Sequence, residues 1–384
     1  MKHRALICLL LLTLFLMGCV RPGSGSEPAD KGAANLADNA YLSSYLSARS
    51  GQFFYFTEES PVNGANRIYV YDSVSGEVFP LCAKPECTHK KGDCNAAIPS
   101  DLGNINLTVY GDRLYFLGES ERKDDKRFLR VYSVGLDGSD RRISAKIEMG
   151  LMNSITAYLG IYDGTIYRLA YGEVVENGRS YMVGTLVSQP LDGDGESKEL
   201  FRTEFQDGAF FGTLQPGKLW FCMYDSGGKM HLYLYDIDAD RVDTVFEGMP
   251  PTYAFRMTAL EDRLVFHETH PAFSYSLEDG TFTELANAEG LVRYGGDTMF
   301  AWTSLDVGRC FAEDGSVLQD GVLDSSLFKE ENRSTRTYLG VIDGKYCFLV
   351  DIAKDDSDEE KHNYFLVYDS KTNTFSVPWD SDMK

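Results

Sequence analysis

Residues 111–138 read GDRLYFLGESERKDDKRFLRVYSVGLDG and contain two patterns that recur along the chain. The first is a turn, Gly111–Asp112, that leads directly into an aromatic strand. The second is an alternating strand, Leu129–Tyr132, that is followed by the turn Asp137–Gly138. Asp-Gly between alternating apolar runs is a strong hairpin signal, because both turn residues tolerate a positive φ angle. The stretch therefore predicts antiparallel strands joined by tight turns.

The first pattern, a turn that feeds an aromatic strand, occurs about seven times, and repeats of this kind indicate a stacked architecture. Its copies are Ser50–Phe56, Gly111–Phe116, Asp163–Tyr167, Gly217–Phe221, Asp262–Phe266, Gly296–Phe300 and Asp343–Phe348.

The second pattern, a strand followed by a hairpin turn, recurs at the same spacing. The strands are Ile68–Tyr71, Leu129–Tyr132, Leu186–Ser188, Leu232–Tyr235, Phe273–Tyr275, Cys310–Ala312 and Phe365–Tyr368. Their turns are Ser75–Gly76, Asp137–Gly138, Asp192–Gly193, Asp238–Ala239, Asp279–Gly280, Asp314–Gly315 and Lys371–Thr372. Six intervals separate Gly76 from Thr372, which gives about 49 residues per repeat, a length that suits a four-stranded propeller blade.

In three repeats a further strand is predicted before the aromatic strand, in the position of the innermost strand of a blade. These strands are Ile105–Val109, Thr252–Met257 and Thr337–Val341. One blade cannot bury both of its faces, so the blades must stack and the ring must close. We predict an all-β fold, a single β-propeller of seven four-stranded blades over residues 40–384, with six or eight blades as the nearest alternatives. Two packed β-sandwich domains would not produce an even period. Closure should join the C-terminal strands to residues near Tyr41.

The N-terminus has the features of an export signal. Lys2 and Arg4 precede an apolar run, Ala5–Met17, that is too short to span a bilayer, and this arrangement is typical of a signal peptide, residues 1–18. The sequence Leu16-Met-Gly-Cys19 resembles the bacterial lipobox, in which the cysteine thiol receives a lipid and becomes the new N-terminus. We expect lipid attachment at Cys19, a flexible tether over residues 19–39, and a location on the outer side of a bacterial cell membrane.

The composition restricts the partners. The formal net charge of −21 excludes nucleic acid as a natural partner, because a strongly acidic surface repels phosphate backbones. An aromatic content of 13%, mostly tyrosine and phenylalanine, favours half-buried strands over helices. The expected partners are therefore the membrane, reached through the lipid anchor, and an extracellular protein or glycan ligand.

One local cluster could carry metal chemistry. Cys82, Cys87, His89 and Cys94 stand in an insertion, residues 82–94, after the first blade. Three thiolates and an imidazole make a complete tetrahedral zinc set, although the first gap is wider than the usual Cys-x2-Cys spacing. The alternatives are a disulfide between two of the cysteines, as in many exported proteins, and reactive or redox use of the thiols. If the loop holds zinc or a disulfide, its role is structural and it is not an active site.

Other candidates have structural interpretations. Cys222, Cys310 and Cys347 lie within strand patterns and are expected to be buried and inert. His267 and His270 have the wrong spacing for a zinc-protease helix. The aspartates between Asp236 and Asp240, and the acidic run between Asp355 and Glu360, are expected to be solvated loops and not calcium sites.

The repeated hairpins and the cysteine insertion resemble those of uncharacterised propeller lipoproteins of Gram-positive anaerobes, and more loosely the TolB-like and low-density-lipoprotein-receptor-like propellers. The resemblance covers residues 40 to 378. It implies a propeller on the outer side of the membrane, and it carries no active site with it.

Two functions follow as hypotheses. The first is a membrane-anchored binding or scaffold propeller for a protein, cell-wall or glycan ligand, built from inter-blade loops. The second is a carbohydrate- or peptide-active hydrolase or lyase whose carboxylates converge on the propeller axis, an arrangement that leaves no linear motif. We find no nucleophile elbow, phosphate loop or dinucleotide fingerprint in the sequence. Whether the chain is an enzyme therefore stays open at this stage.

Overall fold

The computed structural model describes most of the chain from Leu46 onward. The described residues are 46–58, 66–89, 93–99, 105–123, 126–150, 152–192, 197–205, 211–225, 227, 229–248, 256–268, 271–286, 290–328, 334–353 and 361–381. The predicted signal peptide, the tether and Cys19 lie outside them. Within the described part no helix is long and apolar enough to cross a membrane.

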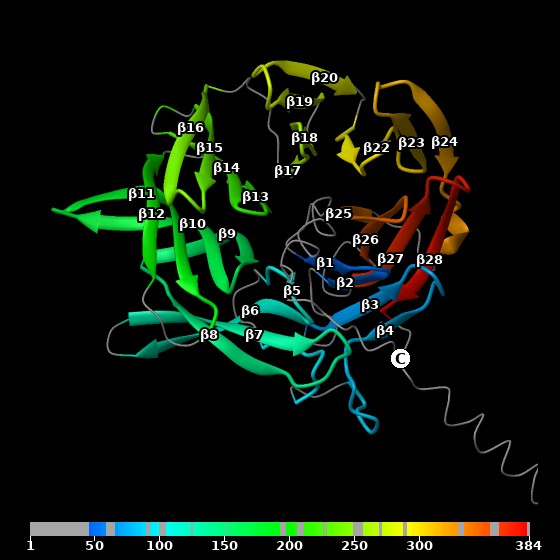
Figure 1. Ribbon diagram of the computed structural model, residues 1–384. Coiled ribbons are helices and arrows are strands. Elements are labelled where there is room, and N and C mark those ends of the chain that lie inside the picture. The colour runs from blue at the N-terminus through cyan, green and yellow to red at the C-terminus, as the bar shows by residue number, and fades with distance from the viewer. Residues whose placement is uncertain are drawn as a thin grey trace, which may run out of the picture. The chain divides into compact units, whose positions relative to one another are not determined.

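The described residues form seven four-stranded antiparallel sheets, each made of consecutive strands, arranged around a ring (Figure 1). This confirms the predicted seven-bladed β-propeller. Blades 1 to 4 contain β1 (Ser47–Ser50), β2 (Phe53–Thr57), β3 (Ile68–Asp72), β4 (Val78–Pro80), β5 (Thr108–Tyr110), β6 (Arg113–Lys123), β7 (Lys126–Gly135), β8 (Arg142–Glu148), β9 (Met152–Tyr162), β10 (Thr165–Glu176), β11 (Arg179–Pro190), β12 (Lys198–Phe205), β13 (Phe211–Gln215), β14 (Lys218–Tyr224), β15 (Met230–Asp236) and β16 (Arg241–Glu247).

Blades 5 to 7 contain β17 (Arg256–Ala259), β18 (Arg263–His267), β19 (Ala272–Ser276), β20 (Phe282–Ala286), β21 (Arg293–Tyr294), β22 (Thr298–Trp302), β23 (Val307–Ala312), β24 (Val317–Val322), β25 (Ser334–Ile342), β26 (Lys345–Ala353), β27 (Lys361–Asp369) and β28 (Thr374–Asp380). A short 3-10 helix, η2 (Ser325–Leu327), follows β24.

Where they are described, the predicted turns and strands occupy their expected places; Gly193 and residues 252–255 lie outside the described residues. The aromatic strands are the second strands of the blades, and the alternating strands are the third. At Asp163–Gly164 and Asp343–Gly344 both residues have positive φ angles, as the sharp turn between a first and a second strand requires. Local turn chemistry therefore sets the register of each blade, and the aromatic side chains of the second strands are buried between blades.

The two faces of the ring differ. The turns between first and second strands and between third and fourth strands share one face, here named the turn face, and most are short, such as Asp163–Gly164 between β9 and β10. The opposite face, here named the loop face, carries the loops between second and third strands and the connections between blades. The connection between β4 and β5, residues 81–107, starts from this face, and its residues Ala83 and Asn95 contact the β7–β8 turn of blade 2. On blades 2 and 3 the second and third strands are long, up to 12 residues, and extend the loop face outward.

The ring closes where blade 7 meets blade 1, as predicted, although Tyr41 itself lies outside the described residues. Each of these blades is completed by its own four strands, so side chains and not a shared sheet join them. The ring of Phe365 stacks on Phe56 at 4.2 Å, and Tyr69 packs against Trp379 at 4.7 Å. We call this contact between blades 1 and 7 the seam.

Polar contacts complete the seam. Ser47 Oγ in β1 donates a hydrogen bond to the carbonyl oxygen of Leu339 in β25 at 2.6 Å. On the turn face Ser73 Oγ donates to a carboxylate oxygen of Asp343 at 2.7 Å, and Arg49 lies 3.5 Å from the same carboxylate. These groups fix the relative position of the two blades, while the aromatic contacts supply most of the buried apolar area.

We predict that Phe365→Ala lowers the free energy of unfolding by about 3–5 kcal/mol, because it removes a fully buried ring from the seam. Amide hydrogen exchange should then rise first in blades 1 and 7, because the Phe365 ring of blade 7 packs against Phe56 and Tyr71 of blade 1. The matched control is Phe221→Ala in blade 4, which is equally buried and should destabilise without selective exchange at the seam. An even rise around the ring in Phe365→Ala would contradict this role of the seam.

Candidate metal centre

The structure brings together the four residues of the cysteine insertion. The ligand atoms of Cys82, Cys87, His89 and Cys94 all lie within 4.8 Å of one another. Cys94 is fully buried, and the other three side chains are partly buried. The insertion is part of the connection from blade 1 to blade 2, and its residues reach the β7–β8 turn of blade 2.

The spacing of these atoms fits a tetrahedral ion. Ligands bound at about 2.0–2.3 Å from a tetrahedral zinc stand about 3.3–3.8 Å apart. The distance from Cys94 Sγ to His89 Nδ1 is 3.5 Å, and the three sulfur atoms are not bonded to one another. The cluster can therefore hold a metal ion with little movement of its side chains.

The two cysteines at the ends of the cluster differ electrostatically. Burial raises the pKa of the Cys82 thiol, but backbone N–H groups of Lys84 and Asn95 outweigh it and lower that pKa overall. Burial raises the pKa of Cys94 to about 12. A bound cation would stabilise the Cys94 thiolate against this rise in pKa.

Local backbone geometry shapes the loop around the four side chains. His89 has a positive φ of 57°, and its N–H donates to Cys87 Sγ at 3.4 Å. Arg141, in the β7–β8 turn of blade 2, donates through Nη1 to the carbonyl oxygens of Cys94 and Ala97, both at 2.7 Å. The positive φ turns the chain back on itself, and the arginine fixes the end of the loop.

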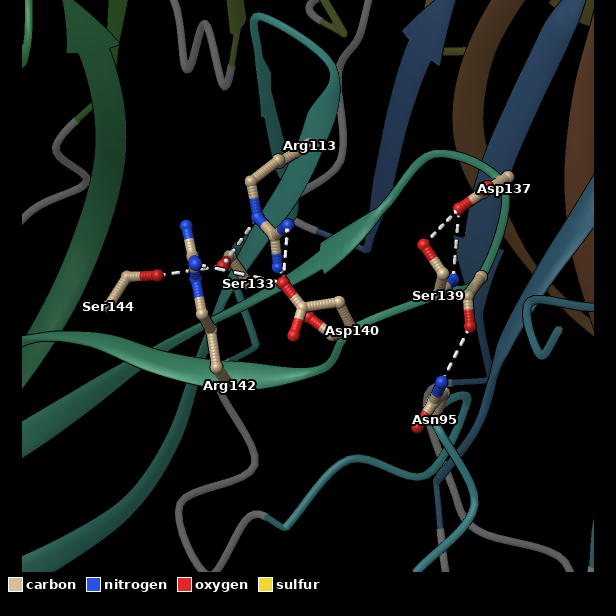
Figure 2. Close-up of polar contacts among 9 residues, drawn as sticks. Asn95, Arg113, Ser133, Asp137, Ser139, Asp140, Arg142 and Ser144 are labelled. Atoms are coloured by element: carbon tan, nitrogen blue, oxygen red, sulfur yellow. Dashed lines mark hydrogen bonds and ion pairs between the residues drawn. The ribbon is translucent and has the colours of Figure 1, made fainter. Parts of the chain in front are cut away.

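The loop is anchored to the β7–β8 turn of blade 2 (Figure 2). Asn95 Nδ2 and the backbone N–H of Ala83 both donate to the carbonyl oxygen of Gly138, at 2.7 and 3.0 Å. Gly138 has a φ of 81°, and a Cβ atom there would lie 2.6 Å from the nitrogen of Cys82. A glycine is therefore required where the cysteine loop touches blade 2.

The same turn is stabilised from its other side, where Figure 2 shows Asp137, Ser139 and Arg113. Asp137 accepts hydrogen bonds from the N–H and the hydroxyl of Ser139 at 3.0 and 2.6 Å. Arg113 pairs with Asp140 at 3.1 Å and donates to Ser133. The turn is thus a rigid platform, and the cysteine loop links blade 1 to blade 2 through it.

The remaining candidates have the predicted structural roles where they are described. Cys222, Cys310 and Cys347 are fully buried in β14, β23 and β26, and burial raises the pKa of each thiol. The turn between Asp236 and Asp240 is a hairpin on the turn face, in which Asp236 accepts from the N–H of Ala239. His270 and the run between Asp355 and Glu360 lie outside the described residues.

Sequence reasoning missed a group of basic side chains. Arg256, Arg293 and Arg336 lie at the loop-face ends of three innermost strands, and His267 ends the strand beside Arg256. The sequence does contain a signal for this group, since an arginine stands near the start of the innermost strand in three consecutive blades. That pattern can be recognised only once the strand boundaries are known.

Comparison with known proteins supports the fold. No protein-family model and no curated protein matches the sequence. A crystal structure of puromycin hydrolase is similar with 13% identity and a TM-score of 0.53, covering 94% of this chain and 56% of that chain. This chain therefore spans about half the length of that hydrolase, and at this identity the likeness shows the fold alone.

Two further propellers are similar at lower scores. The β-propeller domain of the Trilobed protease from Pyrococcus furiosus, which has an open velcro topology, shows 10% identity and a TM-score of 0.48, covering 89% of this chain and 96% of that one. A putative 6-phosphogluconolactonase from Bacteroides uniformis shows 13% identity and a TM-score of 0.49, covering 85% and 95%.

We predict that Gly138→Ala destabilises the protein more than Gly76→Ala does. Both glycines have similar positive φ angles in equivalent turns, but a Cβ at Gly76 would meet nothing within 4 Å. Each variant should lose about 1–2 kcal/mol of unfolding free energy from backbone strain, and Gly138→Ala should lose about 1–3 kcal/mol more from displacement of the cysteine loop. Denaturant unfolding measures both, and equal losses would show that the loop does not depend on this contact.

Proposed function

We propose that this protein is a bacterial lipoprotein, anchored outside the cytoplasm through Cys19, whose propeller binds a protein, cell-wall or glycan ligand on its loop face. The observation that carries the proposal is the asymmetry of the ring. The turn face consists mainly of short turns, whereas the loop face carries the extended hairpins of blades 2 and 3. Binding surfaces are built from such loops on a rigid scaffold.

The lipobox and the tether support the placement. Two acyl chains on Cys19 and its glycerol would hold the chain stably on a membrane, and the Gly- and Ser-containing segment after it would separate the propeller from the surface. The resemblance to propeller lipoproteins of Gram-positive anaerobes agrees with this location. Puromycin hydrolase shares the fold, but the activity in its name belongs to a chain almost twice as long.

We further propose that the Cys82–Cys94 loop binds a zinc ion and that the role of this ion is structural. Three cysteines and one histidine occupy all four positions of a tetrahedral zinc, so no position is left for a substrate. The contacts of the loop with Arg141 and Gly138 support this role, because they make the loop a bracket between blades 1 and 2. The ion would keep the bracket folded.

To test the placement and the binding face together, full-length chain and Cys19→Ser can be expressed in a bacterium and fractionated. Wild type should sediment with membranes and incorporate labelled fatty acid, and Cys19→Ser should do neither. Hydrogen exchange of the detergent-purified wild type with soluble peptidoglycan fragments should then show protection in loop-face segments such as residues 303–306. The turn Asp343–Gly344 on the turn face is the internal control.

Two results would contradict this function. Protection confined to the turn face would reverse the proposed orientation. Turnover of a glycan or peptide substrate, abolished by single substitutions in loop-face residues, would establish the hydrolase or lyase hypothesis in its place.

We predict that the reduced full-length chain retains one zinc ion in native mass spectrometry. His89→Ala and Cys94→Ser should each lose it, whereas Cys222→Ser, which removes a buried thiol far along the chain in blade 4, should keep it. Retention should also weaken as the pH falls, because protons compete with the metal for the thiolates. A metal-free chain that is lighter by two hydrogens after purification without reductant would replace the zinc with a disulfide.

A further inference from the structure

Basic side chains gather at the loop-face ends of the inner strands of blades 5 to 7. Arg256 is the first residue of β17, Arg293 the first of β21, and Arg336 lies near the start of β25. Because first strands of all blades run from the loop face to the turn face, these three residues lie at the same end of the ring. His267, at the end of β18, is the direct partner of Arg256 across the sheet. We call these four residues the arginine cluster.

Aromatic rings hold two of the arginines in place. Arg336 lies over the ring of Trp302 at 4.1 Å, and so reaches from blade 7 onto blade 6. Arg293 lies over Tyr338 and Phe348 at 5.6 and 5.8 Å, and its side chain is only 8% exposed. Stacking fixes the plane of a guanidinium and leaves its edge free to donate hydrogen bonds.

Several hydrogen-bonding atoms of Arg293, Arg336 and His267 have no partner within the described residues. Arg293 donates through Nη1 to the carbonyl oxygen of Leu291 at 2.8 Å, and Arg336 donates through Nη2 to that of Leu305. The Nε atoms of both arginines and Nδ1 of the fully buried His267 have no hydrogen-bond partner in the described part of the protein. A buried donor left without a partner costs about 1–3 kcal/mol. Within the described residues, Nε of Arg293 and Nε of Arg336 therefore lack an acceptor.

The positive charges in the cluster repel one another. Burial, together with the charges of Arg256 and Arg293, lowers the pKa of His267 to about 3. Burial also lowers the pKa of Arg293 and, aided by the charge of Arg293, that of Arg336. Glu268 and Asp306 act in the opposite direction on Arg293 and Arg336, respectively, yet neither arginine forms an ion pair with a described carboxylate. Buried charges without such a pair are strongly destabilising.

We propose that the arginine cluster binds an oxyanion group, a carboxylate or a phosphate, of the ligand that docks on the loop face. An oxyanion would accept from the unused donors of Arg293 and Arg336 in the forked geometry that guanidinium groups prefer. Arg336 is partly exposed, so the cluster is open to solvent at that side. In a chain with a net charge of −21, it would also attract an anionic ligand to one place on the ring. This inference rests on the proposed function for the identity of the binding face.

The test is titration calorimetry of the full-length chain in detergent, with glucuronate and with inorganic phosphate at constant ionic strength. We expect binding that is at least about tenfold weaker in Arg293→Met, the loss expected when one charge-assisted hydrogen-bonding group is removed. The melting temperature of this variant without anion should stay the same or rise, because an uncompensated buried charge is removed. Arg241→Met is the matched control, since Arg241 is exposed and pairs with Asp243 in blade 4; it should bind like wild type.

Nuclear magnetic resonance of the histidine side chains gives an independent readout. A bound anion should raise the pKa of His267, because it favours the protonated ring, and His267→Asn assigns the signal. Binding of glucuronate alone would identify the carboxylate of an acidic glycan as the ligand group, and binding of phosphate alone would identify a phosphorylated ligand.

Absence of heat with both anions would overturn the inference. Equal affinity of wild type and Arg293→Met would do the same, because it would show an adventitious ion only. A lower melting temperature of Arg293→Met without any anion binding would assign the cluster a purely structural role. None of these results would affect membrane anchoring or the exchange footprint on the loop face, so failure of the inference can be separated from failure of the proposed function.

Discussion

The seam between blades 1 and 7 is the contact on which the ring depends. Each blade is a meander of consecutive strands, so no described backbone pairing joins the two ends of the propeller. Every other pair of neighbouring blades is also tied by the chain itself, whereas the seam has only side chains such as Phe56, Phe365 and Trp379. A stack of aromatic rings is well suited to this task, because it buries a large apolar area with a defined geometry. All surfaces built across several blades require that this contact holds.

With the ring closed, the direction of the chain divides it into two unlike faces. Turns such as Asp163–Gly164 keep the connections on the turn face short. They need positive φ angles, which Asp and Gly can adopt. The loop face receives the extended hairpins of blades 2 and 3. The cysteine loop, in the connection between blades 1 and 2, is fastened by Gly138 and Arg141 to the β7–β8 turn of blade 2. A metal there would add stiffness between the first two blades.

The arginine cluster differs from the apolar core of the blades in its effect on the stability of the folded protein. The blades elsewhere bury aromatic and aliphatic side chains, which lowers the free energy of the folded state. Nε of Arg293 and Nδ1 of His267 are buried with no described hydrogen-bond partner, which raises it. Buried polar groups without partners are typical of functional sites, where stability is given up for binding. The position of these groups, near the ring axis on the loop face, agrees with that interpretation.

The sequence by itself determined the fold class, the number of blades and the order of strands, because turn chemistry and strand alternation act over a few residues and repeat along the chain. It also singled out Cys82, Cys87, His89 and Cys94, which are close in sequence and therefore had to be close in space. Only the tertiary structure decided how the ring closes and that Arg293 meets Tyr338 and Phe348 from the next blade. Those contacts join residues of different blades through side-chain packing, and packing between distant segments leaves no periodic trace in a single sequence.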